Sequence, residues 1–358
     1  MYSEDLLHLS INQDTTLLTT GSNTGFKVFR LDPFEVINQD DRGSFKIVEM
    51  YESTQLLLLV GNGEQPAFSP KRLTVWNIAE RTPICETCFP EPVLSVRMNR
   101  MRIVAVIIDS IYVYITTTMK TQNIISTVEN PKGLIALSPT HTECNLLFPA
   151  SSTKGQVQVY DCFSMQTKTI INAHNSPLAY ISISYPGHIC CTASIKGTVL
   201  RAFSLPDGIP ICALKRGISQ ADIYSIRFSH DSHYLVSTSS TGTIHVYSIL
   251  SNSPLAPDWG SAFKQTFLSA ASYILPPSYK ESLETQRSLI SIKTGFTHPF
   301  IATLTTSNEF IISISHSQDY IIYKIDLGPS PSFKIHSLGK LSKQILSQQN
   351  LDTLILTN

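Results

Sequence analysis

Short runs of β-forming residues, separated by turn residues, recur along almost the whole sequence and limit what this chain can fold into. Examples are RLTVWNI, RIVAVII, SIYVYIT, QVQVYDC, IYSIRFS and TIHVYSI, which are rich in Val, Ile and Tyr. No long stretch holds the apolar period of a helix. The runs fall into seven groups of about four, at the period of roughly 40–50 residues that is typical of propeller blades. The sequence therefore predicts an all-β fold, a seven-bladed WD40-like β-propeller.

The even spacing of the runs also bears on domain organisation. No linker or shift of composition interrupts the chain, as expected for one closed ring of small sheets, in which radial closure hides most sheet edges. We therefore expect a single propeller over residues 1–358. A pair of β-sandwiches is the alternative, which the even spacing disfavours.

One connection breaks this rhythm. From about residue 250 to residue 286 no strand pattern appears, which is long for a loop in a compact domain, and we place this loop in blade six. Its apolar residues are Trp259, Phe263, Phe267, Leu268, Tyr273, Ile274, Leu275 and Tyr279. One interpretation is a satellite cluster against the side of the propeller. The other is an apolar finger that enters a membrane interface through Phe263, Phe267, Ile274 and Leu275.

Composition narrows the classes of partner. The 27 Lys and Arg residues balance 27 Asp and Glu residues, so nucleic-acid binding is not expected and any anionic partner requires a local basic cluster. The seven cysteines are odd in number and scattered, which indicates reduced thiols inside the cell. The MYSED start does not resemble a signal peptide. No apolar run approaches the ~20 residues that cross a bilayer, so membrane contact is expected to be peripheral.

Motifs for catalysis or metal binding are weak. Cys85 and Cys88 form a C-x-x-C without a second pair, and on a strand their thiols face opposite sides. The sequence contains no G-x-S-x-G, H-E-x-x-H or phosphate-loop motif. We therefore expect no enzymatic activity, no metal site and no cofactor.

The stretch from His188 to Tyr247 carries the most specific motifs. It contains TASIKGTVLRAF, LKRG, IYSIRFS and SSTGTIHVY in that order. Together these resemble the PROPPIN (WIPI-type) family of phosphoinositide-binding propellers, which has Arg-Arg-Gly in place of Lys-Arg-Gly. VGNGEQPAFSPKRLTVWN and NPKGLIALSP extend the likeness to about residues 6–290. The WD40 signature is poorly met, since the nearest dipeptides are Trp76-Asn77 and Tyr160-Asp161.

The resemblance implies two head-group pockets on the rim of blades five and six, one on each side of Lys215 and Arg216. Adjacent side chains on a strand point to opposite faces, so these two cations are expected to serve different pockets. The implied members of the first pocket are Lys215, His174, Thr192, Ser194, Lys196, Thr198 and Arg201. Those of the second are Arg216, Thr238, Ser239, Thr243 and His245. Because lysine lacks the planar fork of arginine, we expect the first pocket to bind more weakly.

The resemblance also implies a cellular role. The ligands are phosphatidylinositol 3-phosphate and/or phosphatidylinositol 3,5-bisphosphate, and the protein is cytoplasmic and peripheral on pre-autophagosomal, endosomal or vacuolar membranes. There it recruits autophagy factors, among them a lipid-transfer protein, through the loop with Pro70, Lys71 and Arg72 in blade two. We expect a monomer in solution. The alternative is a protein-interaction scaffold with a degenerate lipid site.

Overall fold

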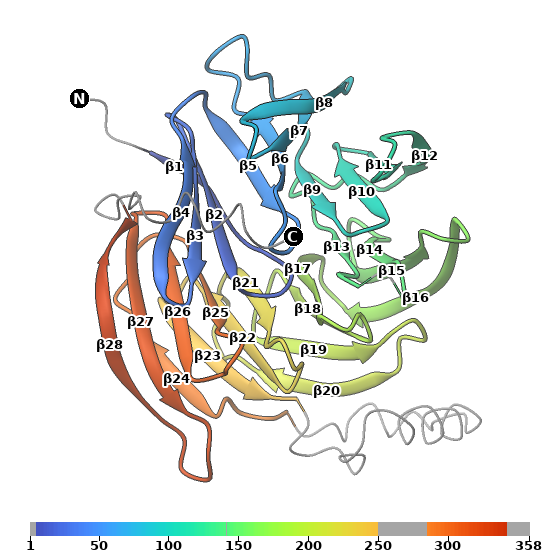
Figure 1. Cartoon of the computed structure of the whole chain (residues 1–358). Helices are drawn as coiled ribbons and strands as arrows, with labels where there is room; N and C mark the ends of the chain where they lie inside the picture. The colour runs from blue at the N-terminus through green and yellow to red at the C-terminus, as the bar shows by residue number, and fades with distance from the viewer. Residues whose placement is uncertain (1–4, 141, 250–284, 342–358) are drawn as a thin grey trace.

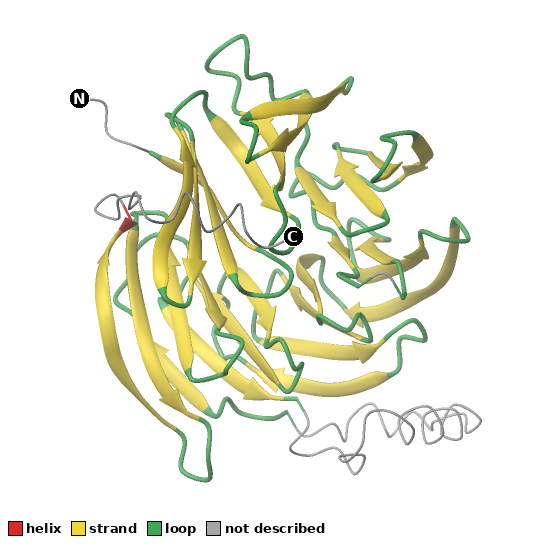
Figure 2. Cartoon of the chain, viewed as in Figure 1, coloured by secondary structure: helices red, strands yellow, loops and turns green. Residues whose placement is uncertain are grey.

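The chain folds as a closed ring of seven antiparallel four-stranded sheets (Figures 1 and 2). The computed structural model describes residues 5–140, 142–249 and 285–341. Each sheet consists of four consecutive strands, so the chain completes one blade before the next begins. The predicted all-β, seven-bladed propeller is confirmed. Within the described ranges, no helix is long and apolar enough to cross a membrane.

In the first three blades, the predicted runs RLTVWNI, RIVAVII and SIYVYIT form strands β7, β10 and β11. Blade one comprises β1 (Leu6–Ile11), β2 (Leu17–Ser22), β3 (Phe26–Leu31) and β4 (Phe34–Asp40). Blade two comprises β5 (Phe45–Met50), β6 (Leu56–Gly61), β7 (Arg72–Asn77) and β8 (Thr82–Cys88). Blade three comprises β9 (Ser95–Met98), β10 (Arg102–Val106), β11 (Ser110–Ile115) and β12 (Thr121–Ser126).

The remaining four blades repeat the same plan. Blade four comprises β13 (Ala136–Leu137), β14 (Asn145–Pro149), β15 (Gly155–Asp161) and β16 (Gln166–His174). Blade five comprises β17 (Leu178–Ile183), β18 (Ile189–Ser194), β19 (Val199–Ser204) and β20 (Pro210–Lys215). Blade six comprises β21 (Ile223–Phe228), β22 (Tyr234–Ser239), β23 (Thr243–Ser248) and β24 (Ile290–Lys293). Blade seven comprises β25 (Phe300–Leu304), β26 (Phe310–Ser315), β27 (Asp319–Asp326) and β28 (Ser332–Lys340).

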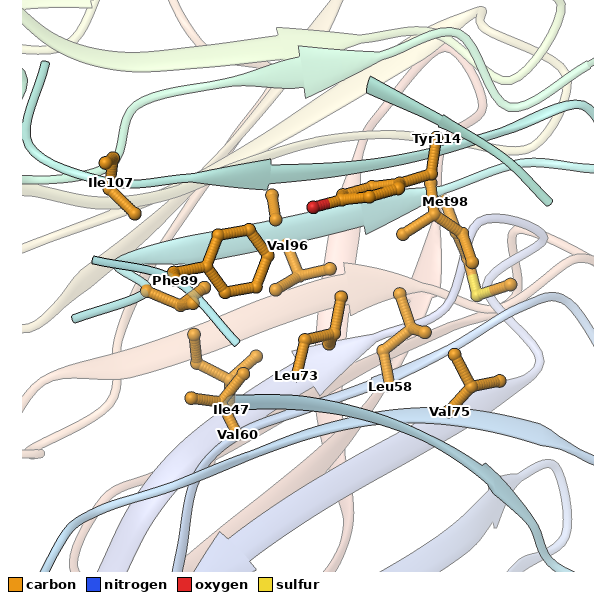
Figure 3. Packing of buried hydrophobic residues seen from close by; sticks show 13 residues of the cluster. Ile47, Leu58, Val60, Leu73, Val75, Phe89, Val96, Met98, Ile107 and Tyr114 are labelled. Carbon is orange, nitrogen blue, oxygen red and sulfur yellow. The ribbon is translucent and has the colours of Figure 1, made fainter. Parts of the chain in front are cut away.

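Apolar side chains fill the space between neighbouring blades. Figure 3 shows Leu58 and Leu73 of blade two facing Val96 of blade three, and all three are fully buried. Because both faces of a blade are covered, the inner strands read as nearly continuous apolar runs rather than alternating ones. Burial of each such side chain contributes roughly 1.5–3 kcal/mol, so this packing holds the ring together.

The ring closes between blades one and seven by side-chain packing rather than by exchange of a strand. Leu18 and Phe29 of blade one pack with Ile312 and Ile314 of blade seven. The ring centroids of Phe34 and Tyr320 lie 4.6 Å apart across the same boundary. Each of these two blades is complete in itself, since β1–β4 and β25–β28 form separate sheets.

The connection from β23 to β24 contains the segment that the sequence singles out. Both strands belong to blade six, and Thr243 of β23 pairs with Lys293 of β24. Residues 250–284 lie outside the described residues. The membrane-insertion candidates in that segment, Phe263, Phe267, Ile274 and Leu275, therefore remain a prediction from the sequence.

Candidate anion-binding site at blades five and six

The outer strand of blade five ends with two consecutive cations that lie on different faces. In the pairing of β20 with β19, Lys215 is opposite Val199 and Leu214 is opposite Leu200. Leu200 and Leu214 pack with the apolar side chains of blade six. Because side chains alternate along a strand, Lys215 lies on the face toward blade four and Arg216 follows on the face toward blade six. β20 runs along the outer edge of the ring (Figure 1).

Three polar side chains meet on the face toward blade four. Thr192 of β18 is directly opposite Arg201 of β19, and His174 ends β16 of the neighbouring blade. Arg201 Nη1 donates to the Ala173 carbonyl (2.7 Å) and to Nδ1 of His174 (3.1 Å). Nε2 of His174 lies 3.0 Å from the Thr192 hydroxyl oxygen, and that hydroxyl donates to the Arg201 carbonyl (3.3 Å). Since arginine only donates, His174 accepts at Nδ1 and carries its proton on Nε2.

This arrangement keeps His174 neutral and leaves the charge on Arg201. His174 is 9% exposed. Burial, followed by the nearby Arg201 charge, lowers the pKa of His174 to about 4. The other guanidinium nitrogens of Arg201, Nε and Nη2, have no hydrogen-bond partner among the described residues. The cluster therefore offers a fixed cation with free donors beside a neutral imidazole.

The turn between β18 and β19 supplies the remaining first-pocket candidates. Lys196 is exposed, Ser194 is buried, and the Ser194 carbonyl accepts from the Gly197 amide (2.8 Å). Gly197 has φ +60°, and a Cβ there would lie 1.9 Å from the Ala221 carbonyl oxygen, so only glycine fits. The Thr198 carbonyl accepts from the amides of Arg216 (2.9 Å) and Gly217 (3.3 Å). This turn is thereby tied to the segment that contains the second cation.

Arg216 is almost completely buried, at 7% exposed. Its Nε donates to the Gly197 carbonyl (2.7 Å) and its Nη2 donates to the Ser219 carbonyl. Burial lowers the pKa of its guanidinium. In the described part of the chain, neither Arg216 nor Lys215 forms an ion pair with a carboxylate, and the same holds for Arg201 and Lys196. A buried charge without a counter-ion is costly, and an anion bound here offsets that cost.

His245, Ser239 and Thr243 lie on the face of blade six that Arg216 approaches. Thr243 is opposite Ser239, both are buried, and His245 follows two residues along the same strand. Burial, followed by the Arg216 charge, lowers the pKa of His245 to about 4. Its Nδ1 lies 3.3 Å from the Ser288 hydroxyl oxygen. These side chains form the core of a second polar cluster.

Thr238 is not brought to this cluster. It is fully buried, and its hydroxyl donates to the Phe300 carbonyl of blade seven (2.9 Å). Its neighbour Val236, two residues earlier on β22, packs in the core between blades six and seven. Thr238 therefore points away from Arg216, because Ser239 and Thr238 are consecutive and face opposite sides. Its place in the second pocket is not supported by this geometry.

Lys293 is a further cation on the second cluster that sequence reasoning missed. It is exposed and pairs with Thr243, just as Lys215 pairs with Val199 one blade earlier. The same comparison aligns Lys293-Thr294-Gly295 with Lys215-Arg216-Gly217. This repeat could identify Lys293 from the sequence, but it follows the 250–286 connection, which has no strand pattern that would set the register.

At the end of the 250–286 connection, the chain pairs with the outer strand of blade five beside Lys215. The Lys215 amide donates to the Gln286 carbonyl (2.8 Å), and the Gln286 amide donates to the Ala213 carbonyl (2.9 Å). Gln286 thereby forms a parallel bridge with Leu214 of β20. Arg287, the next residue, is exposed. The end of the 250–286 connection is thus anchored at the first cation of the site.

The candidate partner loop in blade two lies beside a cavity. Lys71 donates to the Pro90 carbonyl (2.6 Å), and Arg72 Nη1 donates to Glu86 (3.2 Å). The cavity has a volume of about 110 Å³ and is lined by Phe45, Leu59, Gly61, Ala67, Phe68, Ser69, Arg72, Thr74, Trp76, Pro83 and Glu86. The indole N–H of Trp76 is buried with no hydrogen-bond partner among the described residues.

Comparison with known proteins places this chain in a family. A model of the PROPPIN family matches residues 5–338. The chain is 34% identical over 339 residues to autophagy-related protein 18 of Dictyostelium discoideum, covering 91% of this chain and 90% of that protein. Two solved structures share the fold. Kluyveromyces lactis Hsv2 matches with a TM-score of 0.75 at 15% identity, over 95% of this chain and 100% of that one. KlAtg21, solved with the coiled coil of AgAtg16, matches with a TM-score of 0.74 at 23% identity, over 94% of this chain and 99% of that one.

Proposed function

Since this chain belongs to the PROPPIN family, whose members are autophagy-related, we propose that it binds phosphoinositide head groups through two sites at blades five and six. The first site centres on Lys215 and Arg201, and the second on Arg216 and His245. The ligands are phosphatidylinositol 3-phosphate and/or phosphatidylinositol 3,5-bisphosphate in the surface of a membrane. Through them the protein is recruited to pre-autophagosomal, endosomal or vacuolar membranes.

One observation carries the proposal: several cations gather at one part of the rim and form no ion pair with a carboxylate among the described residues. Arg216 is buried, Arg201 keeps free donors, and Lys215 is exposed at the end of β20. Phosphate groups suit such a site, because guanidinium and ammonium groups form short charge-assisted hydrogen bonds with phosphate oxygens. The Thr192 and Thr243 hydroxyls already donate to the carbonyls of Arg201 and Thr241, so the proposal depends on the cations.

Two sites on one rigid rim give more than the sum of two weak contacts. Once the first head group is bound, the second binding event is intramolecular and proceeds at a high effective concentration. The position of the sites on the rim also strengthens membrane binding, because each basic residue near an anionic membrane surface contributes about 1 kcal/mol to the binding free energy. The proposed sites lie on opposite faces of blade five, but both are next to the end of its outer strand, β20. We therefore propose that one membrane surface contacts both.

Sedimentation with liposomes of different composition tests the proposal. Vesicles that contain phosphatidylinositol 3-phosphate or phosphatidylinositol 3,5-bisphosphate are expected to carry the protein into the pellet. Matched vesicles with phosphatidylinositol, or with an equal charge supplied by phosphatidylserine, are expected to leave it in solution. Sedimentation that depends only on total charge, or no sedimentation with any vesicle, contradicts specific head-group binding.

Membrane-bound protein then recruits an autophagy factor through blade two. The support for this part is the cavity beside the loop, which Arg72 lines. A related protein, KlAtg21, forms a complex with the coiled coil of AgAtg16. The partner expected from the family resemblance is a lipid-transfer protein of the autophagy machinery. Lys71→Glu/Arg72→Glu is expected to abolish binding of such a purified partner and to leave liposome binding unchanged.

A scaffold without lipid binding is the second candidate function, and the same blade-two cavity favours it. The liposome experiment separates the two. A chain that binds its protein partner but sediments with none of the vesicles is a scaffold alone. Loss of both activities in Lys71→Glu/Arg72→Glu, with normal folding, contradicts separate surfaces for lipid and protein.

A further inference from the structure

Two exposed isoleucines flank the basic cluster. Ile218 follows Arg216-Gly217 and is 90% exposed, the largest value for any large apolar side chain among the described residues. Ile195 precedes Lys196 in the turn between β18 and β19 and is 41% exposed. Single exposed apolar residues are common on protein surfaces and need no explanation. Here, however, both stand directly beside cations of the proposed site.

The turns that display these side chains are fixed to one another. The Gln220 side-chain amide donates to the Ile195 carbonyl (3.3 Å), and the Ala221 amide donates to the Lys196 carbonyl (3.3 Å). Arg216 adds a third bond between the turns by donating to the Gly197 carbonyl (2.7 Å). These bonds hold residues 195–198 and 216–221 as one rigid unit.

We propose that Ile195 and Ile218 insert into the membrane interface when the head-group sites are occupied, as a rigid apolar pair on blade five. This inference rests on the proposed phosphoinositide binding. The chemistry favours a lipid surface, because an interface with acyl chains beneath anionic head groups matches apolar tips beside cations that form no ion pair among the described residues. A protein partner with the same features needs an acidic rim around an apolar pocket, and it is the alternative that the experiment excludes.

The two isoleucines belong to other parts of the sequence than the 250–286 connection. They lie in the turn after β18 and in the link from β20 to β21, both of which are described. Partial transfer of two isoleucines from water to the interface is expected to strengthen liposome binding about tenfold, given the area-based free energy of burial. A soluble head group has no acyl region, so its affinity is expected to be independent of both side chains.

The test compares Ile195→Ser/Ile218→Ser with the control Ile124→Ser, which changes a 52% exposed isoleucine on β12 of blade three. Each protein is titrated with vesicles containing phosphatidylinositol 3-phosphate, and separately with soluble inositol 1,3-bisphosphate by calorimetry. The inference predicts about tenfold weaker vesicle binding for the double variant alone, with unchanged head-group affinity in all proteins. Unchanged vesicle binding in the double variant overturns it.

The two serine substitutions could disturb the turns and lower head-group affinity together with vesicle binding. A variant with a fluorescent side chain at position 218 gives a second test that does not depend on a loss of binding. In Ile218→Trp, the indole emission is expected to shift to shorter wavelength when vesicles are added, after subtraction of the wild-type signal. No shift at saturating vesicle concentration overturns the inference. If wild-type protein binds neither vesicles nor the head group, the proposed function itself fails. If wild type binds both and the double variant binds equally well, only the insertion fails.

Discussion

Lys215 and Arg216 are consecutive in the sequence, yet they belong to different inter-blade surfaces. Lys215 pairs with Val199 on the face toward blade four, where Thr192 and Arg201 lie opposite each other. Arg216 lies on the face toward blade six, where burial and then the Arg216 charge lower the pKa of His245. A single strand end thus supplies one cation to each of two polar clusters.

Removal of both cations is expected to abolish membrane binding without unfolding the propeller. In Lys215→Ala/Arg216→Ala, each proposed site loses its central charge, so sedimentation with phosphatidylinositol 3-phosphate liposomes is expected to fall to background. The matched control is Lys120→Ala/Lys132→Ala, which removes two exposed lysines elsewhere. Full sedimentation of the double variant, with a normal melting temperature, shows that the site has been misassigned.

Lys293 is expected to act in the second site and not in the first. It shares a face with Thr243 and His245, and blade five separates it from Arg201. Lys293→Ala is therefore expected to weaken one class of head-group site by about 1 kcal/mol, the scale of one charge-assisted hydrogen bond, and to leave the other unchanged. Calorimetry of the variant checks this. Equal weakening of both classes contradicts the assignment.

The buried histidines make stability depend on pH in a defined window. The pKa of His174 is about 4 in the folded protein and about 6.5 in the unfolded chain. A lowered folded pKa means that the stabilisation is present above pH 6.5 and is lost as the pH falls toward 4. At pH 5 the loss is about 2 kcal/mol for this residue. His174→Gln is expected to reduce the difference in unfolding free energy between pH 7 and pH 5 by that amount, measured by denaturant titration. An unchanged difference contradicts it.

The apolar residues of the 250–286 connection yield a separate prediction. Replacement of Phe263, Phe267, Ile274 and Leu275 by Ser is expected to weaken liposome binding and to spare soluble head-group binding. Each inserted side chain contributes up to roughly 1.5–3 kcal/mol, comparable with several surface charges. Equal loss of both activities indicates damaged folding instead. No loss of either favours the satellite-cluster interpretation.

The fold followed from the sequence because a propeller repeats one local pattern. Each run such as RIVAV or IYSIRF became a strand, since β-branched residues covered on both faces suit inner strands of a blade. The opposite placement of Lys215 and Arg216 also followed, because alternation along a strand is a local property. The sequence resemblance named His174 as a neighbour of Thr192 and Arg201, although β16 and β19 belong to different blades.

Features set by packing between blades could not be predicted in this way. Thr238 lies in a motif with Ser239 and Thr243, but the register of blade six turns it toward Phe300. Lys293 and the bridge from Gln286 to Leu214 follow a connection with no strand pattern, so their position relative to β20 depends on tertiary contacts. Sequence alternation gives the face of a residue only after the strand that contains it has been recognised.

The most direct test of the central claim is calorimetry with a soluble head group, inositol 1,3-bisphosphate, free of the amplification that two membrane contacts produce. Wild type is expected to bind two head groups, and each of Lys215→Ala and Arg216→Ala is expected to weaken one site and leave the other unchanged. Arg216→Ala is expected to reduce the head-group binding free energy by about 1 kcal/mol more than Lys215→Ala does. Lys215→Arg is expected to tighten the first site, because a guanidinium binds phosphate through two hydrogen bonds. A single site in wild type that is insensitive to Lys215, or two intact sites in both alanine variants, contradicts the account.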